Sequence, residues 1–192
     1  MPVLGSSGAR PGTPDSVVTD WSVDPDDWGT FLSKVWDDWY NRDVGKVFVQ
    51  LFENAVGQWM GQPSSSCIFA KFCGKGLAIE HDGSVYSCDH YVYPEYKLGN
   101  IRDLPEGEMA FSARQENFGA SKFNSLPLHC RNCKYLSVCN GECPKNRFLR
   151  TPAGQPGLNY LCSGLMKFWE HIDRDATYLG RRLKNGEAPR LA

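Results

Sequence analysis

The chain has 192 residues, 41% of them hydrophobic and 22% charged, and its formal net charge is −1. This composition fits a globular protein of one domain, or of one domain with an appended piece, and the near-neutral charge gives no indication of nucleic-acid binding. No apolar run approaches the ~20 residues of a membrane span, and residues 1–20 lack the apolar core of a signal peptide, so we expect a cytoplasmic protein without membrane partners.

The N-terminal part of the chain predicts a tail and then a helix. Residues 1–20 are rich in Gly, Ser and Pro, which indicates a disordered or adventitious N-terminus. Asp24 followed by Pro25 is a helix start signal. Apolar residues then recur at helical spacing and are expected to pack in a core: Trp28, Phe31, Leu32, Val35, Trp36 and Trp39.

A buried strand is expected after Gly45, over Lys46–Phe52, followed by a short helix or turn over Ala55–Met60. A lone helix and strand with no earlier partners resemble the last unit of a partial α/β barrel, because such a strand cannot pair its own edges. We therefore interpret residues 22–62 as the remnant of a barrel.

From Cys67 to about Gly164 the sequence predicts loops, short strands and turns. Leu77–Glu80 and Ser84–Ser87 flank an Asp-Gly dipeptide, which predicts a β-hairpin. Leu98–Asn100 is expected to be a turn, and residues 103–117 are expected to contain a short helix. A long final helix ends near Asn185-Gly186, with one apolar face formed by Leu165, Phe168, Trp169 and Ile172.

The eight cysteines carry most of the functional information. Four of them have the spacing C-x2-C-x5-C-x3-C, namely Cys130, Cys133, Cys139 and Cys143, and the others are Cys67, Cys73, Cys88 and Cys162. In a reducing compartment, clustered cysteines hold metal more often than they form disulfides. With only one C-x2-C pair, the irregular spacing favours iron–sulfur clusters over a zinc ribbon, and zinc remains the alternative. His90 and His129 lie beside cysteines but are expected near the metal or at the surface, not as ligands.

Longer motifs around these cysteines resemble the SPASM domain, the C-terminal auxiliary-cluster domain of many radical SAM enzymes. Three segments are similar to the anaerobic sulfatase-maturating enzymes in particular: His81-Asp-Gly-Ser-Val-Tyr-Ser-Cys-Asp-His90, Asn140-Gly-Glu-Cys-Pro-Lys-Asn-Arg147 and Gly157-Leu-Asn-Tyr-Leu-Cys162. The resemblance extends over residues 22–175, which makes the helix and strand before Cys67 a remnant of the radical SAM partial barrel.

The resemblance implies two [4Fe-4S] clusters with interlaced ligation. The first would bind Cys67, Cys73, Cys88 and Cys143, and the second would bind Cys130, Cys133, Cys139 and Cys162. With every iron ligated by cysteine, such clusters serve electron transfer and support of the substrate site. Family members oxidise a Cys or Ser of a sulfatase polypeptide to formylglycine, and Asp89 corresponds to the proposed general base.

The chain departs from the family because it has no C-x3-C-x2-C motif, which would hold S-adenosylmethionine on a third [4Fe-4S] cluster. We therefore expect the C-terminal portion of a maturase, inactive alone, which is either a truncated fragment or one half of a split enzyme whose radical SAM half is a separate chain. Whether the chain itself counts as an enzyme is left open.

The expected fold class is α+β: a loop-rich SPASM domain with a short β-hairpin over residues 63–165, and a C-terminal helix and tail over 166–192. The alternatives are a structural zinc-binding interaction module, and the SPASM part of another peptide-modifying radical SAM enzyme.

Overall fold

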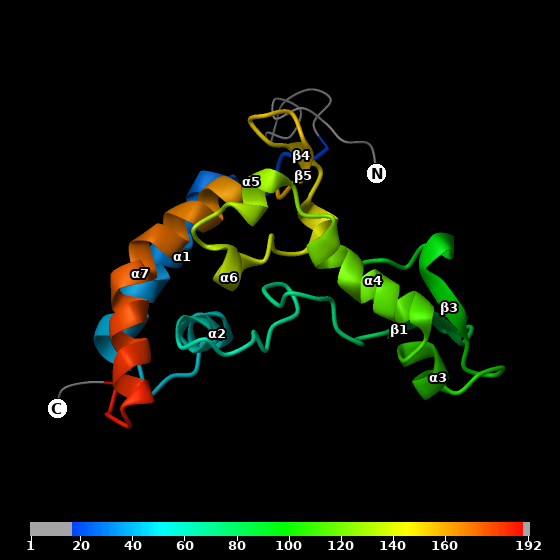
Figure 1. Cartoon of the computed structure of the whole chain (residues 1–192), viewed down its shortest axis with the longest axis horizontal. Helices are drawn as coiled ribbons and strands as arrows, with labels where there is room; N and C mark the ends of the chain where they lie inside the picture. Colours follow the sequence, from blue (N-terminus) through cyan, green and yellow to red (C-terminus); the bar gives the residue numbers. More distant parts are fainter. Residues whose placement is uncertain (1–16, 190–192) are drawn as a thin grey trace. The chain divides into compact units, whose positions relative to one another are not determined.

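The structure is a computed structural model that describes residues 17–189 (Figure 1). Contacts divide the chain into two compact units: a larger unit that consists of the residues up to Ala70 and from Leu126 onward, and a smaller unit, Lys71–Ser125. Most of the predicted tail over residues 1–20 lies outside the described residues. The domain boundaries predicted at residues 62 and 165 rest on family resemblance and not on contacts, and they stay a prediction.

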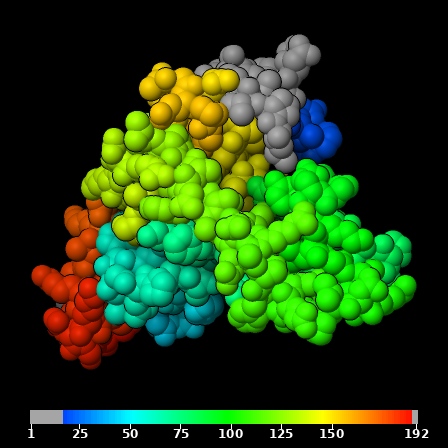
Figure 2. All heavy atoms as spheres, turned by 45° about the vertical axis from the view of Figure 1, so that its right-hand side comes forward, coloured from blue at the N-terminus to red at the C-terminus, as the bar shows by residue number. Residues whose placement is uncertain are grey.

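The larger unit is mostly helical. Its elements in chain order are α1 (Pro25–Asp38), the π-helical turn η2 (Trp39–Asp43), α2 (Gln50–Trp59), α5 (Leu128–Arg131), α6 (Leu136–Cys139), the 3-10 turn η4 (Pro144–Asn146), the antiparallel pair β4 (Leu149–Arg150) and β5 (Pro156–Leu158), and α7 (Cys162–Lys184). Figure 1 shows α1 beside α7, and Figure 2 shows α2 against the C-terminal part of α7. In the described part of the chain, no helix is both long and apolar enough to cross a membrane.

The start of α1 is as predicted from the sequence. Oδ1 of Asp24 accepts a hydrogen bond from the backbone N–H of Asp26 at 2.8 Å, and Pro25 occupies the first helical position. The predicted apolar stripe is only partly buried. Its members Leu32, Trp36 and Trp39 are in the core, whereas Phe31 and Val35 are exposed. The buried face of α1 is therefore narrower than its apolar face.

Helices α1 and α7 approach each other so closely that only glycine fits at their contact. A Cβ on Gly164 would lie 1.7 Å from the carbonyl oxygen of Pro25, and a Cβ on Gly29 would lie 2.4 Å from the carbonyl oxygen of Gly164. Further along, Nζ of Lys167 donates to Oγ1 of Thr30 at 2.7 Å. The two helices therefore run in the same direction from a common glycine contact.

An aromatic cluster forms the core of the larger unit. Trp36 packs edge-to-face on Phe52 and Phe168, at centroid separations of 5.3 and 6.3 Å. Trp169 packs edge-to-face on Phe69 at 5.3 Å. The predicted core face of the final helix is confirmed, since all four of its members are buried: Leu165, Phe168, Trp169 and Ile172.

The strand predicted over Lys46–Phe52 is wrong, because Gln50–Trp59 is a helix and no strand occurs among the described residues before Ala78. Val47 and Phe48, which gave the segment its strand-like appearance, are 49% and 75% exposed. The residues that are buried follow helical spacing instead: Phe52, Ala55 and Val56. The predicted short helix after the strand is thus part of α2, and the expected helix–strand unit is a pair of helices.

The smaller unit contains a three-stranded antiparallel sheet and two helices. Its elements are β1 (Ala78–Ile79), β2 (Ser84–Tyr86), the 3-10 turn η3 (Pro94–Tyr96), β3 (Lys97–Asn100), α3 (Glu106–Ala110) and α4 (Ala113–Asn124), with strand order β1-β2-β3. The predicted hairpin is confirmed, and Gly83 supplies the positive φ of +83° at its turn. The turn predicted over Leu98–Asn100 is wrong, since these residues belong to β3. The predicted short helix is two helices that extend to Asn124.

These elements confirm a mixed α+β fold with small antiparallel sheets and a long C-terminal helix.

We predict that Gly164→Ala destabilises the larger unit by about 1–3 kcal/mol or more, because the new methyl group overlaps backbone that cannot give way. Gly57→Ala in α2 is the matched control. Its Cβ would meet only the flexible end of Gln62, at 3.1 Å. The effect on the free energy of unfolding is therefore expected to lie between zero and a stabilisation of about 1 kcal/mol. Thermal unfolding followed by circular dichroism, at equal metal content, measures both. Equal melting temperatures for Gly164→Ala and the parent chain would contradict the glycine contact.

Candidate metal centre

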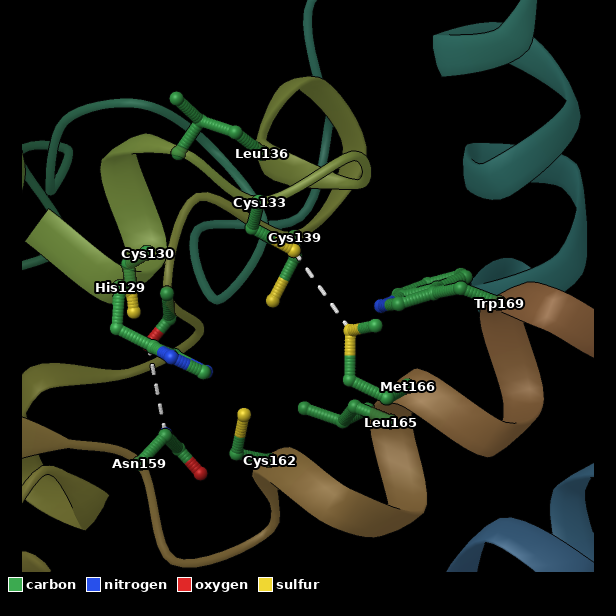
Figure 3. A pocket seen from close by; sticks show the side chains of 11 residues that line it. His129, Cys130, Cys133, Leu136, Cys139, Asn159, Cys162, Leu165, Met166 and Trp169 are labelled. Carbon is green, nitrogen blue, oxygen red and sulfur yellow. Dashed lines mark hydrogen bonds between the residues drawn. The ribbon is translucent and has the colours of Figure 1, made fainter. Parts of the chain in front are cut away.

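Four cysteines of the larger unit line one cavity. Cys130 belongs to the short helix α5, Cys139 is the last residue of α6, and Cys162 is the first residue of α7. Cys133 lies between α5 and α6, three residues after Cys130, and its backbone N–H donates to the carbonyl of Cys130 at 3.1 Å. Figure 3 shows the four side chains directed toward a common space. These are the four residues that the family resemblance assigned to the second cluster.

The rest of the cavity wall is largely apolar. Its apolar members are Leu136, Leu165, Met166 and Trp169. No carboxylate is among the lining residues of the described chain, so sulfur is the principal donor type available to a metal. Such a set fits soft metals, either an iron–sulfur cluster or zinc. Backbone also supports the sulfurs, because the N–H of Tyr135 donates to Sγ of Cys133 at 3.4 Å.

Burial disfavours the ionised form of these thiols. It raises the pKa of Cys139 to about 11 and that of Cys162 to about 12, and the pKa of Cys130 is raised for the same reason. The neighbouring cysteine charges raise all three values further, which reflects how close the sulfurs lie. A backbone N–H from Gly141 lowers the pKa of Cys139 in part. Four thiolates at this place therefore need a cation, and its binding would displace protons.

A left-handed loop separates Cys139 from Cys143. Asn140, Gly141 and Glu142 all have positive φ, at 47°, 71° and 51°. Asn140 and Glu142 are the only non-glycine residues in the described chain with this conformation. Each non-glycine residue in this region costs on the order of 1–3 kcal/mol. At Gly141 the positive φ itself favours glycine, and a Cβ there would also lie 2.4 Å from Cδ2 of Leu126. The loop reverses the chain so that Cys139 lines the cavity and Cys143 does not.

Arg147 and Asn159 hold this loop in place. The guanidinium of Arg147 donates to the carbonyl oxygens of all three loop residues, at 2.8, 2.8 and 3.0 Å. Nδ2 of Asn159, a buried residue, donates to the carboxylate of Glu142 and to the carbonyl of Cys143. The hydrogen bonds that involve the guanidinium of Arg147 or the carboxylate of Glu142 contribute about 1.5–3 kcal/mol each, which offsets the strain of the loop.

The four cysteines assigned to the first cluster are distributed over both units. Cys67 and Cys143 belong to the larger unit, and Cys73 and Cys88 belong to the smaller one. Within the smaller unit, Gln115 of α4 connects the neighbours of the latter two. Its Nε2 donates to the carbonyl of Gly74 at 3.2 Å and to that of Ser87 at 3.0 Å. The segments that carry Cys73 and Cys88 are thereby held side by side, whereas ligation by all four residues stays a prediction.

Asp89 lies beside Cys88 in the smaller unit, and its carboxylate is exposed. Sγ of Cys88 donates to Oδ1 of Asp89 at 3.1 Å, and this hydrogen bond, with the nearby charge of His90, holds the pKa of Asp89 below its usual value. Asp89 is therefore not buried within the smaller unit, so this unit alone does not raise its pKa toward the neutral range that suits a general base. Ligand atoms of these three residues lie within 4.8 Å of one another.

Two residues at the cavity were not singled out in the sequence, Asn159 and Met166. Trp169 was predicted only as a core residue, and His129, predicted near the metal or at the surface, lies at the cavity and is exposed. Met166 and Trp169 follow Cys162 by four and seven residues, so helical spacing alone places them on the face of α7 that carries the ligand. Sδ of Met166 lies 3.6 Å from Sγ of Cys133. In the sequence, the apolar periodicity of α7 was the only signal at these positions, and it indicated a core.

Comparisons with known proteins agree with this geometry. A family model described as SPASM, an iron–sulfur cluster-binding domain, matches residues 67–134. A serine-type anaerobic sulfatase-maturating enzyme of Bacteroides thetaiotaomicron is 47% identical over 175 residues, which are 91% of this chain and 42% of that protein. A cysteine-type enzyme of Clostridium novyi is 33% identical over 165 residues, which are 85% of this chain and 44% of that protein.

A solved structure, described as native anSMEcpe with bound AdoMet and Cp18Cys peptide, is 27% identical and gives a TM-score of 0.75 over 92% of this chain and 47% of that chain. The chain spans less than half the length of the curated relatives that it matches. It contains the SPASM iron–sulfur cluster-binding domain of an anaerobic sulfatase-maturating enzyme.

Proposed function

We propose that this chain provides two auxiliary [4Fe-4S] clusters to an anaerobic sulfatase maturase, in which they carry electrons and support the substrate site. The observation that supports this most is the convergence of Cys130, Cys133, Cys139 and Cys162 on one apolar cavity. A fully cysteine-ligated cluster has no open coordination position, so it suits electron transfer better than substrate binding. When bound, it would supply a one-electron carrier.

The residues of the chain would hold and shield such a cluster. The four thiolates would ligate it, and the side chains of Leu136, Leu165 and Met166 would exclude water from its surroundings. A low local dielectric strengthens the interaction between the sulfurs and the metal charge and helps to set the reduction potential. The hydrogen-bonded loop after Cys139 would keep that ligand from moving when the charge of the cluster changes.

The interlaced assignment of ligands has structural support in the same loop. Cys139 and Cys143 are only four residues apart, yet one lines the cavity and the other does not. We therefore assign Cys143 to a separate centre with Cys67, Cys73 and Cys88. Gln115 supports the ligands of the first cluster, because its side chain hydrogen-bonds to the backbone next to Cys73 and next to Cys88.

Formylglycine formation itself is proposed only for a complete enzyme. The chain has no C-x3-C-x2-C motif for S-adenosylmethionine and its cluster, so a further radical SAM segment, in the same protein or in a separate chain, would have to supply them. Residues 22–62, which form a pair of helices and not a helix–strand unit, would adjoin that segment. A sulfatase polypeptide would be the substrate, and one structural relative is described with a bound peptide. Asp89 would accept the proton of the substrate thiol or hydroxyl at its carboxylate.

We expect anaerobically reconstituted protein to contain about eight irons and eight sulfides per chain, with broad absorption near ~400 nm. Iron, sulfide and zinc analysis alongside the visible spectrum measures this. Two zinc ions per chain and no colour would replace the proposal with a structural zinc module.

Cysteine variants test which ligands share a centre. Cys139→Ala and Cys143→Ala should each lose about half of the iron, because each removes a ligand from one of the two clusters. Adding Cys162→Ala to Cys139→Ala should cost no further iron, whereas adding it to Cys143→Ala should remove nearly all of it. The reverse pattern would place Cys143 and Cys162 on the same centre and would disprove the interlaced assignment.

The role of Asp89 is tested in an active enzyme reconstituted with the radical SAM segment. Asp89→Asn should lower formylglycine formation by about 10²–10⁴-fold, the usual contribution of a general base, with iron content unchanged. Mass spectrometry of a substrate peptide measures the product. Glu80→Gln, an exposed carboxylate elsewhere in the smaller unit, is the control. Full activity of Asp89→Asn would exclude Asp89 as the base.

A further inference from the structure

The indole of Trp169 brings a buried polar group to the sulfur-lined cavity. The residue is 1% exposed, and Nε1 finds no hydrogen-bond acceptor in the part of the chain that the structure describes. Buried N–H groups are nearly always paired, because an unpaired one loses its hydrogen bond to water without replacement. Figure 3 shows the nitrogen edge of this indole directed into the space that the cysteines surround. A missing acceptor at this place points to a group that the cavity would bind.

Packing fixes the direction of this N–H. The Trp169 ring lies against Phe168 at a centroid separation of 4.9 Å, against Phe69 at 5.3 Å and against Trp59 at 5.9 Å. With neighbours on several sides, the ring cannot turn its nitrogen away from the cavity without disturbing the core. The donor is therefore positioned before a metal centre binds, so no reorganisation is required.

Trp36 provides an internal comparison. It is also completely buried and its Nε1 also lacks an acceptor among the described residues. Its neighbours, however, are the aromatic rings of Trp39, Phe52 and Phe168, and it does not line the cavity. The same chemical group thus occurs twice in one core, once facing rings and once facing sulfur.

We propose that the N–H of Trp169 donates a hydrogen bond to one of the thiolate sulfurs that line the cavity when these cysteines ligate a [4Fe-4S] cluster, and that it raises the reduction potential of that cluster. The inference rests on the proposed cluster-binding function. A reduced cluster carries one more negative charge than an oxidised one, so a hydrogen bond to its sulfur stabilises the reduced state more. Trp169 is a positioning and tuning residue in this scheme, not a ligand.

The test compares Trp169→Phe with the matched control Trp36→Phe in the reconstituted holoprotein. Both substitutions remove one buried indole from the same core, but only the first removes a donor from the cavity. Electron paramagnetic resonance during a redox titration gives the potentials of the two clusters separately. We expect Trp169→Phe to disfavour reduction of one cluster by about threefold to tenfold, where tenfold corresponds to about 59 mV for one electron. The other cluster and Trp36→Phe should be unchanged.

A second readout distinguishes the hydrogen bond from a change in packing. Electron–nuclear double resonance of the reduced cluster, in H₂O and D₂O, should show an exchangeable proton that Trp169→Phe lacks and Trp36→Phe keeps. Replacing Trp169 with 3-benzothienylalanine, which has sulfur in place of the N–H at nearly the same shape, should give the same loss. This variant also covers the case in which the smaller Phe side chain impairs folding.

Iron and sulfide analysis of the same samples distinguishes a failure of the Trp169 hydrogen bond from a failure of cluster binding. Unchanged potentials and an unchanged proton signal in fully loaded Trp169 variants would overturn the role of Trp169 and leave the cluster function intact. Equal shifts in Trp169→Phe and Trp36→Phe would assign the effect to packing and would also overturn it. Absence of iron from the reconstituted parent chain would overturn the proposed function, and this inference with it.

Discussion

The close contact of α1 with α7 is the constraint on which the metal centre depends. Gly29 and Gly164 let the two backbones touch, and Gly164 lies only two residues after Cys162, the first residue of α7. The position of this ligand is thus set by helix packing rather than by a flexible loop. Because interiors are close-packed, a shift of α7 at the glycine contact would move Cys162, Met166 and Trp169 together.

The loop over residues 140–142 sets the other side of the cavity in a different way. Here the chain accepts strained backbone conformations, which Arg147 stabilises through three carbonyl oxygens. The result is a sharp reversal that directs Cys139 to the cavity and leaves Cys143 outside it. A regular helix through this segment would place residues 139 and 143 on one face, where both thiols would compete for the same centre.

Local signals in the sequence predicted the local structure well. The Asp24 cap, the Asp-Gly hairpin and the apolar face of α7 are each encoded within a few residues, and all are present. The strand predicted over Lys46–Phe52 was wrong because a short apolar run does not distinguish a strand from a buried helix turn. The family resemblance identified the four cysteines at the cavity, whereas spacing alone groups Cys143 with Cys130, Cys133 and Cys139. Neither indicated the glycine contact, which joins residues 135 positions apart (164 minus 29). Neither gave any sign of the Trp169 donor, since only the assembled core determines which way that ring faces.

The core and the cavity share α7, and this arrangement couples protein packing to metal chemistry. Leu165 and Trp169 belong at once to the aromatic core and to the cavity wall. The core gains stability from apolar burial alone, whereas the thiols beside it have raised pKa values and stay protonated without a cation. The larger unit can therefore position its ligands through packing before metal binds, and the metal then replaces protons on thiols that are already in place. Such preorganisation lowers the conformational entropy that binding must overcome, and it explains why the residues beside the sulfurs are large and rigid.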